Sequence, residues 1–376
     1  MKIGVVGAGI VGASIAYHLA KQGAKVSIFD PLPPGSAVSG SSFACLNAFG
    51  RSGEDLAFRL QAIRYHRALA REIGSEHLLH LCGTARIASA GDPAAKLARD
   101  ATTFASAGGE VRSVAAKEMI DLEPRIHARF ATERFLVAEE GWVDSGALCK
   151  QLVKTAVERF GAQFRSARVA GIQASDRWVR LSWQSDLETF DRVVLAVGND
   201  TNSLLKLAGL RELPIKTLPG PLLVLTTQDT SVIRHVVYAD GFHIRPGQGG
   251  YIAGVSALPG ELEPLKRLEG ERLDLLAAGA RWLDGFLHVP RSWTTCPRPV
   301  PASDHPIVGP REECAAISVA AMHGGVTLAP LIGKIAASEI VAALGWPRSI
   351  GRPPTHSSHL LSEREQLPSA WLAASV

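Results

Sequence analysis

The stretch IGVVGAGIVGASIAYHLA, residues 3–20, decides the predicted fold. It carries the pattern G-x-G-x-x-G at Gly7, Gly9 and Gly12, between a strand-like run (IGVV) and a helix-like run. A second strand-like run, KVSIFD, ends at Asp30, close to the spacing of about 20 residues that dinucleotide-binding folds place between the glycines and a ribose-binding acid. The pattern therefore predicts a β-turn-α-β unit that binds a dinucleotide.

Each glycine has a separate predicted role in this turn. Gly7 permits the tight turn, Gly9 lets the backbone approach a pyrophosphate, and Gly12 lets the helix pack closely on the strand. The helix N-terminus presents free N–H groups and the positive end of its dipole to the phosphates, and Asp30 would accept a hydrogen bond from a ribose hydroxyl. The predicted cofactor contacts of this unit also include Ala8, Ile10, Val11 and Pro31.

The composition is that of a globular protein with a large core. Of the 376 residues, 46% are hydrophobic and 20% are charged, which gives a prior of two or three domains. The net charge of +4 comes from scattered basic residues, so nucleic-acid binding has little support. The apolar N-terminus resembles a signal-peptide core, but its glycines argue against one, and no other stretch suggests a membrane span.

The cysteines show no CxxC or other metal-ligand spacing, so no metal site is predicted. An odd, scattered set indicates reduced thiols in a cytoplasmic protein. The five are Cys45, Cys82, Cys149, Cys296 and Cys314.

Two later stretches place glycine where a backbone could meet a ligand. DRVVLAVGND (191–200) ends in the small residues Ala196, Val197 and Gly198, which would let the strand end lie against a nucleotide. In AAMHGGVTLAP (320–330), a glycine pair precedes an apolar helix, whose N-terminus would point at an electron-rich group. The alternatives are an ordinary buried strand with a turn glycine and a plain helix start.

Together with EEGWVDSGAL and CPRPVPASDHPIVG, these motifs resemble the D-amino-acid oxidase/glycine oxidase/D-amino-acid dehydrogenase superfamily of FAD-dependent amine oxidoreductases, over nearly the whole chain and in the family's order. The resemblance implies a mixed α/β fold, in which a Rossmann-like FAD-binding domain (GR2-type) is interleaved with a substrate domain built on a mainly antiparallel sheet. The expected FAD-binding segments are 1–50, 145–205 and 297–352. The expected substrate-binding segments are 51–144 and 206–296, and 353–376 form a peripheral tail.

Periodicity adds a few elements to this outline. Residues 51–73 have helical periodicity. Short β-rich runs between residues 77 and 255 predict the antiparallel sheet, and HVVYADGFHIRP and GGYIAGV form a predicted hairpin.

The resemblance also implies a set of cofactor contacts, with FAD bound noncovalently. The loop 31–50 would wrap the phosphates and the flavin, Val169 would place its backbone against the adenine, and Ala196 to Gly198 would lie near the diphosphate or ribose. The glycine pair would lie under the flavin pyrimidine. The residues implied are Ser41, Ser42, Ala44, Asn47, Val169, Ala196, Val197, Gly198, His323, Gly324, Gly325, Val326 and Thr327.

The implied reaction is oxidation of the C–N bond of an amino acid or N-substituted amino acid, by hydride transfer to flavin N5. The resulting imine would hydrolyse to a keto acid. Arg298, in CPRPVP, matches the family's arginine that forms a two-pronged ion pair with the substrate carboxylate, whereas the alternative is a surface arginine held between prolines. Further candidates are Arg245, Tyr238, His243 and Tyr251.

Two departures from the family bear on the chemistry. Cys296 lies where the sarcosine-oxidase branch carries a flavin-bonded cysteine, but the Arg-Pro that follows is typical of noncovalent members. GGYIAGV lacks the lysine that promotes reaction with oxygen in that branch, which favours a dehydrogenase with a quinone or other acceptor over an oxidase. The remaining alternatives are an NAD-dependent Rossmann dehydrogenase and a flavoprotein subunit of a heteromeric amine, opine or hydroxyproline-type dehydrogenase complex.

Overall fold

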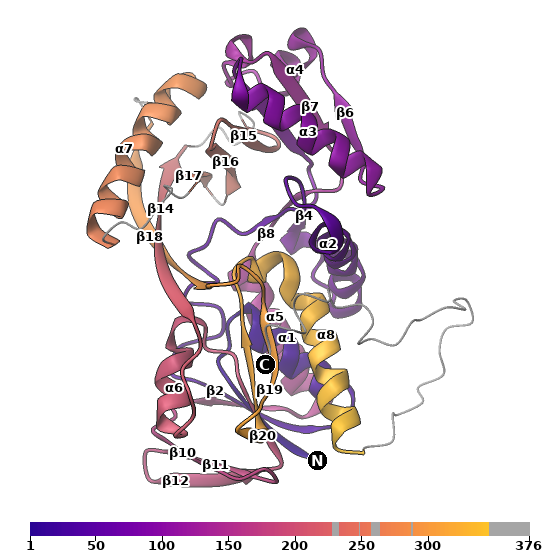
Figure 1. The fold of residues 1–376 in the computed structure, drawn as a ribbon, viewed down its shortest axis with the longest axis vertical. Helices are drawn as coiled ribbons and strands as arrows, with labels where there is room; N and C mark the ends of the chain where they lie inside the picture. The colour runs from indigo at the N-terminus through magenta and orange to yellow at the C-terminus, as the bar shows by residue number, and fades with distance from the viewer. Residues whose placement is uncertain (228–232, 248, 257–263, 287–288, 346–376) are drawn as a thin grey trace, which may run out of the picture.

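The computed structural model describes residues 1–227, 233–247, 249–256, 264–286 and 289–345 (Figure 1). Its lower half in Figure 1 is built on a six-stranded sheet in the order β19-β20-β13-β1-β2-β9. All neighbours in this sheet are parallel except the pair β19 and β20. The strands are β1 (Lys2–Val6), β2 (Lys25–Asp30), β9 (Gln163–Ser166), β13 (Arg192–Leu195), β19 (Ile307–Arg311) and β20 (Cys314–Ala321).

Successive residues of the central strands serve opposite faces of this sheet, because side chains alternate along a strand. Val5 and Val194 belong to the core beneath the helices, whereas Val6 and Val193 belong to the core on the other face. That second face is covered by a three-stranded antiparallel sheet, β10 (Gly171–Ala174), β11 (Val179–Trp183) and β12 (Asp186–Phe190), and by α6 (Thr201–Leu207). Burial on both faces explains why the parallel strands are continuously apolar.

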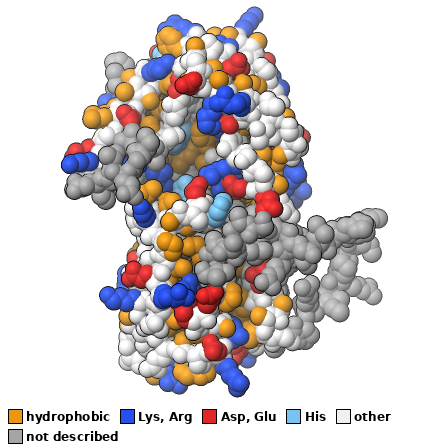
Figure 2. All heavy atoms as spheres, in the orientation of Figure 1, with side chains coloured by type: hydrophobic (Ala, Val, Ile, Leu, Met, Phe, Trp, Pro, Cys, Tyr) orange, Lys and Arg blue, Asp and Glu red, His pale blue; other side chains and the backbone are white. Residues whose placement is uncertain are grey.

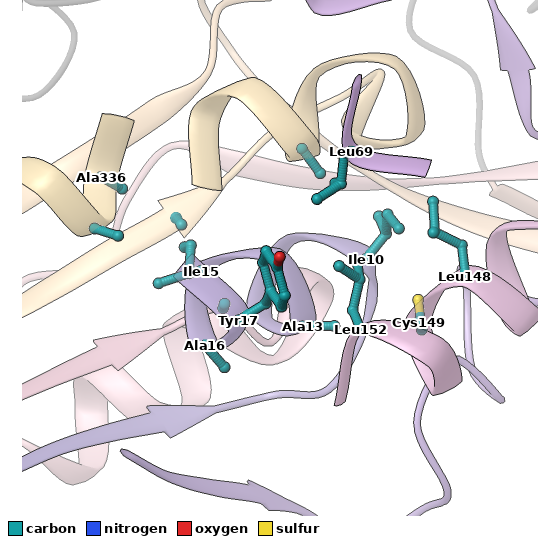
Figure 3. Packing of buried hydrophobic residues seen from close by; sticks show 14 of the residues in the cluster. Ile10, Ala13, Ile15, Ala16, Tyr17, Leu69, Leu148, Cys149, Leu152 and Ala336 are labelled. Atoms are coloured by element: carbon teal, nitrogen blue, oxygen red, sulfur yellow. The ribbon is translucent and has the colours of Figure 1, made fainter. Parts of the chain in front are cut away.

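Four helices pack on the first face: α1 (Ile10–Lys21), α2 (Gly53–Ile73), α5 (Ser145–Phe160) and α8 (Gly325–Ala343). Small residues let α1 and α8 approach closely, since a Cβ on Gly333 would lie 2.2 Å from Ser14 Oγ. Figure 3 shows Ile15 and Tyr17 of α1 together with Leu152 of α5 and Ala336 of α8 in this core. The predicted helix over 51–73 is confirmed as α2.

The upper half of the molecule in Figure 1 holds an eight-stranded sheet in the order β18-β14-β17-β16-β15-β5-β7-β6. Its neighbours are antiparallel except for β15 and β5. The strands are β5 (Thr84–Ala88), β6 (Val111–Ser113), β7 (Glu133–Val137), β14 (Ile215–Thr226), β15 (Val236–Ala239), β16 (Phe242–Gly247), β17 (Gly250–Val255) and β18 (Arg291–Pro301). The predicted mainly antiparallel sheet is confirmed, and β16 and β17 form the expected hairpin.

Some of the β-rich runs lie outside this large sheet. β3 (Cys45–Leu46), β8 (Gly141–Val143) and β4 (Leu79–His80) form a small antiparallel sheet, which Figure 1 shows between the two halves. Three helices accompany the upper half and were not predicted from the sequence, namely α3 (Asp92–Ser106), α4 (Ala116–Leu122) and α7 (Pro264–Trp282). The predicted tail, residues 353–376, lies outside the described residues.

One helix of the described chain, α8, is long and apolar enough to cross a membrane by length and composition. However, 67% of its most apolar window is buried inside the protein. This burial is what a core helix shows, and α8 packs on α1 and α2 accordingly.

Candidate cofactor and substrate site

The glycine-rich turn between β1 and α1 has the geometry that its sequence predicts. Gly7 has φ +106°, and a Cβ there would lie 2.3 Å from the carbonyl oxygen of Ala196. A Cβ on Gly12 would lie 2.1 Å from the carbonyl oxygen of Gly7. Gly9 differs, because its φ is −69° and its Cβ would meet only Ser39 Oγ, at 3.3 Å. Gly7 and Gly12 are therefore required by packing, whereas the space above Gly9 is open to a ligand.

Asp30 is held against this turn by two backbone donors. Its Oδ2 accepts from the N–H of Ala8 at 2.8 Å, and its Oδ1 accepts from the N–H of Leu32 at 2.9 Å. Each carboxylate oxygen can accept more than one hydrogen bond. The carboxylate is therefore fixed at the end of β2 with acceptor capacity left for a diol, and the adjacent Pro31 is exposed.

The N-termini of α1 and α8 lie side by side at the same edge of the sheet. The Ile10 N–H donates to Ser39 Oγ at 3.0 Å, and a Cβ on Gly325 would lie 3.3 Å from the side chain of Val11. α8 has no side-chain cap, and its N-cap residue is Gly324, with φ +70°. Both helices therefore direct free N–H groups and positive dipole ends toward one region.

Residues of the loop 31–50 hydrogen-bond to one another. Ser42 Oγ donates to the carbonyl of Ser39 at 3.1 Å, and Ser41 Oγ is 3.4 Å from the carbonyl of Ala37. These contacts fold the loop on itself. Ala44 is buried and adopts a left-handed conformation with φ +56°, an uncommon one for a residue other than glycine.

Asn47 joins this loop to α8. Its backbone N–H lies 3.4 Å from Thr327 Oγ1, whose hydroxyl donates to the carbonyl of Cys45 at 3.2 Å. Thr327 is buried, whereas the four preceding residues, 323–326, are only partly buried. The glycine pair therefore forms a partly open turn between the buried strand β20 and the buried helix α8.

Two residues of α2 contact this turn, and neither was predicted from the sequence. Pro330 has no N–H to give to the carbonyl of Val326, and the buried His66 Nε2 lies 2.9 Å from that carbonyl in its place. Arg59, only 3% exposed, ion-pairs with Asp55 at 2.9 Å. Its Nη1 would lie 3.2 Å from a Cβ on Gly324. A buried cation and a helix N-terminus therefore reinforce each other's positive potential here.

The end of β13 lies beside the turn between β1 and α1. The Ala196 N–H donates to the carbonyl of Val6 at 2.8 Å, which brings the 196–198 segment to the carboxyl ends of the parallel strands. Ligands of open α/β sheets bind at this edge. Val169 is buried in the core under the small meander sheet.

Arg298 lies on β18, and its guanidinium is close to the neighbouring strand β14. Its guanidinium passes over Gly220 of β14, where a Cβ would lie 2.9 Å from both Nε and Cζ. Nε and Nη2 are buried and have no hydrogen-bond partner among the residues that the structure describes. An unpaired buried donor is costly, more so when it is charged, so this arrangement is suited to an anionic ligand that accepts from both nitrogens.

The positive charge of Arg298 contributes to a lowered pKa at two histidines. Burial lowers the pKa of His243 to about 4, and Arg298 adds to the effect. Burial likewise lowers the pKa of His323 to about 4, again with a contribution from Arg298. Both imidazoles are therefore neutral at neutral pH. The structure thus brings together Arg298, His243 and His323 from β18, β16 and the glycine turn.

Tyr238 and Arg245 line the same region in different ways. The Tyr238 hydroxyl accepts from Asn47 Nδ2 at 3.4 Å, and its ring centroid is 5.8 Å from that of His243. Arg245 donates to the backbone carbonyls of Phe43 and Pro246 and lies over the Trp142 ring at 4.3 Å. Arg245 thus holds the loop 31–50, which we call the cofactor-side loop, through Phe43. Arg298 makes no such contact with this loop among the described residues. The buried Tyr251 lies on β17.

Figure 2 shows a hollow with hydrophobic side chains in the upper half of this face. A separate cavity of about 380 Å³ lies at the other end of α8, between that helix and strands β13, β19 and β20. It shares no residue with the glycine turn or the Arg298 cluster, so its volume is not that of the proposed site.

The described residues contain no group of three or more His, Cys, Asp or Glu side chains that could hold a metal ion. All five cysteines are free thiols. Burial raises the pKa of Cys296 to about 11, so this thiol is protonated at neutral pH.

Several residues of the site were missed in the sequence. Ser39 lies in the serine-rich loop 31–50. The serines of that loop were the only local signal for its contact with the N–H of Ile10, 29 residues earlier in the chain. The others carry no local motif, because their partners are distant in the chain. The missed residues are Ser39, Arg59, His66, Arg86, Glu140 and Trp142.

Comparison with known proteins agrees with this geometry. A sequence model of the family described as FAD dependent oxidoreductase (DAO) matches residues 2–339. The chain is 26% identical to a glycine oxidase of Bacillus licheniformis over 351 residues, which are 90% of this chain and 92% of the relative. It is 25% identical to a glycine oxidase of Bacillus subtilis over 353 residues, with the same coverage of 90% and 92%.

Solved structures show the same fold. Glycine oxidase from Geobacillus kaustophilus superposes with a TM-score of 0.79 at 22% identity, covering 95% of this chain and 99% of that one. Iminodiacetate oxidase from Chelativorans sp. BNC1 superposes with a TM-score of 0.75 at 22% identity, covering 93% and 98%. L-Proline dehydrogenase from P. horikoshii gives a TM-score of 0.76 at 17% identity, with 92% and 94% covered.

Proposed function

Because the chain belongs to the family of FAD-dependent oxidoreductases, we propose that it oxidises the C–N bond of an amino acid or N-substituted amino acid whose carboxylate binds Arg298. The observation that carries this proposal is the pair of buried, unpartnered donors Nε and Nη2 of Arg298. A carboxylate can accept from both at once, which fixes its plane as well as its position. The family match also removes the NAD-dependent alternative.

The residues at the sheet edge fit FAD. Gly9 leaves space for a pyrophosphate at the N-terminus of α1, and Asp30 keeps acceptor capacity for the adenosine ribose. The uncapped N-terminus of α8, with buried Arg59 beneath Gly324, suits the electron-rich end of the flavin pyrimidine. We propose that the remaining predicted contacts, from the loop 31–50, Val169 and the 196–198 segment, complete the cofactor site.

When bound, the flavin supplies the acceptor for the hydride removed from the substrate α-carbon, which leaves an imine that water hydrolyses to a keto acid. The tasks of this chain are to orient and to exclude water. Arg298 would hold the carboxylate so that the α-carbon faces the cofactor edge. His243 and His323, being neutral, add no second positive charge that would compete with Arg298 for the carboxylate. The hydrophobic hollow would keep the amine desolvated.

The relatives support a small substrate. The similar proteins named above act on glycine, iminodiacetate and L-proline, by their names, and all are amino acids or N-substituted amino acids. We propose the same class for this chain, in a cytoplasmic enzyme. The division into an FAD-binding domain (1–50, 145–205 and 297–352) and a substrate-binding domain (51–144 and 206–296) belongs to the same proposal. β17 carries no lysine, which favours a quinone or other carrier over oxygen as electron acceptor.

The test is an anaerobic titration of the purified holoenzyme with a panel of amino acids and N-substituted glycines. At least one carboxylate-bearing amine should bleach the visible flavin band, while its decarboxylated analogue should not. Bleaching by both to the same extent would contradict carboxylate recognition by Arg298. Protein that folds but never binds FAD would contradict the cofactor assignment.

A further inference from the structure

A buried ion pair connects the cofactor-side loop to the upper sheet. Arg86 of β5 and Glu140, in the turn before β8, meet at 2.6 Å between Nη2 and Oε2, and their side chains are 9% and 0% exposed. Thr84 Oγ1 donates to the same carboxylate oxygen at 2.7 Å. These residues are 54 and 56 positions from Glu140 in the chain, so only folding brings them together.

The other oxygen of Glu140 holds the loop directly. Oε1 accepts from the backbone N–H groups of Ala48 and Phe49, both at 2.7 Å. These peptides follow Asn47, the residue that bonds both Thr327 of α8 and Tyr238 of β15. One buried carboxylate therefore sets the path of the backbone immediately after Asn47.

Arg86 contacts Phe49 and Tyr238 through its guanidinium group. Its guanidinium lies over two rings, 4.3 Å from the centroid of Phe49 and 4.2 Å from that of Tyr238. Tyr238 in turn accepts from Asn47 Nδ2 at 3.4 Å. The contacts thus form a closed circuit, from Glu140 through Arg86 and Tyr238 to Asn47, and back to Glu140 through the backbone.

This circuit is fully satisfied and geometrically specific. Glu140 receives four donors, one for each lone-pair direction of a carboxylate. A buried ion pair is weak evidence for added stability, because desolvation offsets its attraction. Its clearer consequence is positional, since four donors and two stacked rings permit one arrangement of Tyr238 and Asn47.

We propose that Glu140 and Arg86 are positioning residues for the oxidation, acting through Tyr238 and Asn47 at the wall of the substrate site. The ring centroids of Tyr238 and His243 are 5.8 Å apart, so a shift of Tyr238 changes the space beside His243 in the proposed substrate site. Asn47 lies against the first turn of α8, so the same shift changes the cofactor side. This inference rests on the proposed function.

The experiment compares three variants of the holoenzyme. Glu140→Gln keeps an acceptor for the Ala48 and Phe49 N–H groups but turns amide hydrogens toward Arg86. Arg86→Lys keeps the charge but loses the planar contact with both rings. Glu271→Gln is the matched control, because Glu271 is likewise 0% exposed and ion-paired to a buried arginine, Arg267, at 3.6 Å within α7.

The measurements are the melting temperature, the visible circular dichroism of bound FAD, and the anaerobic rate of flavin reduction by the best amine of the panel. Glu140→Gln and Arg86→Lys should each change the dichroism and slow reduction by about 10- to 100-fold, as a displaced wall would. Glu271→Gln should lower only the melting temperature. In a Tyr238→Phe background, Glu140→Gln should slow reduction by much less than it does alone.

Other results would overturn the proposal. If Glu140→Gln and Glu271→Gln lose the same stability and leave dichroism and reduction rate unchanged, the pair is only structural. Should Glu140→Gln fail to fold, Arg86→Lys decides by the same two readouts. If no amine of the panel reduces the wild-type enzyme, the proposed function fails. In that case acetate serves as a carboxylate probe. The dichroism of bound FAD and the spectral change on adding acetate, compared between the wild type and the Glu140→Gln and Arg86→Lys variants, still show whether Glu140 and Arg86 shape the site.

Discussion

We propose that FAD binds at the edge of the parallel sheet and that the substrate binds at a wall formed by Arg298, His243 and Tyr238, and these two regions present different groups to a ligand. At the edge, Gly9 and the Gly324–Gly325 pair carry no side chains, so that backbone N–H groups and helix dipoles would face a ligand. At the wall, Arg298 and its neighbours present side chains from several strands. The difference shows why the edge can be predicted from sequence motifs, whereas the wall depends on contacts that only the folded chain brings together.

The two regions also differ in how their charge is arranged. The edge is positive through peptide dipoles and Arg59, which is buried and paired with Asp55. The wall is positive through Arg298, whose Nε and Nη2 have no partner among the described residues. The first arrangement suits a cofactor that stays bound, and the second suits a substrate that binds and leaves.

The largest expected effect is the loss of FAD binding when a side chain is added at Gly9, a position where packing does not require glycine. Gly9→Val should fold, because Gly9 has an ordinary φ and a Cβ there meets only Ser39 Oγ. It should bind FAD at least about 100-fold more weakly, since blocking two charge-assisted hydrogen bonds costs about 3–6 kcal/mol. Flavin content after dialysis and calorimetry of the apoprotein would measure this. Normal FAD content in Gly9→Val would place the pyrophosphate elsewhere.

At the wall, Arg298→Leu should keep FAD but lose the substrate anchor. We expect kcat/KM for the carboxylate substrate to fall by roughly 30-fold to several thousand-fold, equivalent to about 2–5 kcal/mol. Arg298→Lys should recover only part, because an ammonium lacks the two-pronged geometry. Near wild-type kcat/KM in Arg298→Leu would leave Arg298 as a structural residue, and Arg245 would then be the next anchor to test.

A smaller effect concerns pH and the support of α8. Burial lowers the pKa of His66 to about 4, below its ordinary value, so the unfolded chain takes up the proton first as pH falls. Its contribution to stability is therefore present above about pH 6.5 and is lost down to about pH 4, at up to about 1.4 kcal/mol per pH unit.

His66→Gln, which keeps a donor for the Val326 carbonyl, tests this contribution in urea unfolding at pH 7 and pH 5. The variant should lose about 1–2 kcal/mol less between the two pH values than the wild type does. Equal losses in both proteins would show that His66 is not buried in its neutral form.

The smallest effect is expected at Cys296, which precedes Arg298 by two residues on β18. A buried, protonated thiol is a poor nucleophile, so acid precipitation should release FAD from the wild type and from Cys296→Ser alike. The substitution should cost only about 1 kcal/mol of stability, as a buried hydroxyl replaces a thiol. A yellow pellet that loses its colour only in Cys296→Ser would reveal a covalent link.

Most of the cofactor edge could be predicted because its determinants are local. Gly7, Gly9, Gly12 and Asp30 lie within one β-turn-α-β unit, where hydrogen bonding and sterics allow few alternatives. The roles of Arg298 and the glycine pair came from resemblance to a family rather than from periodicity. The partners of Arg245 were not predicted, because no local pattern indicates a contact such as that with Phe43, 202 residues away.

The sequence by itself determined the dinucleotide turn, the alternation of apolar runs that builds the two large sheets, and the presence of an arginine between prolines. These follow from backbone geometry and side-chain period, which act over a few residues. Only the tertiary structure decided that Arg245 is bound to backbone carbonyls while Arg298 has donors without a partner among the described residues, and that Glu140 ties the backbone of Ala48 to Arg86. Those outcomes depend on which polar groups are buried together, and burial is a property of the packed chain.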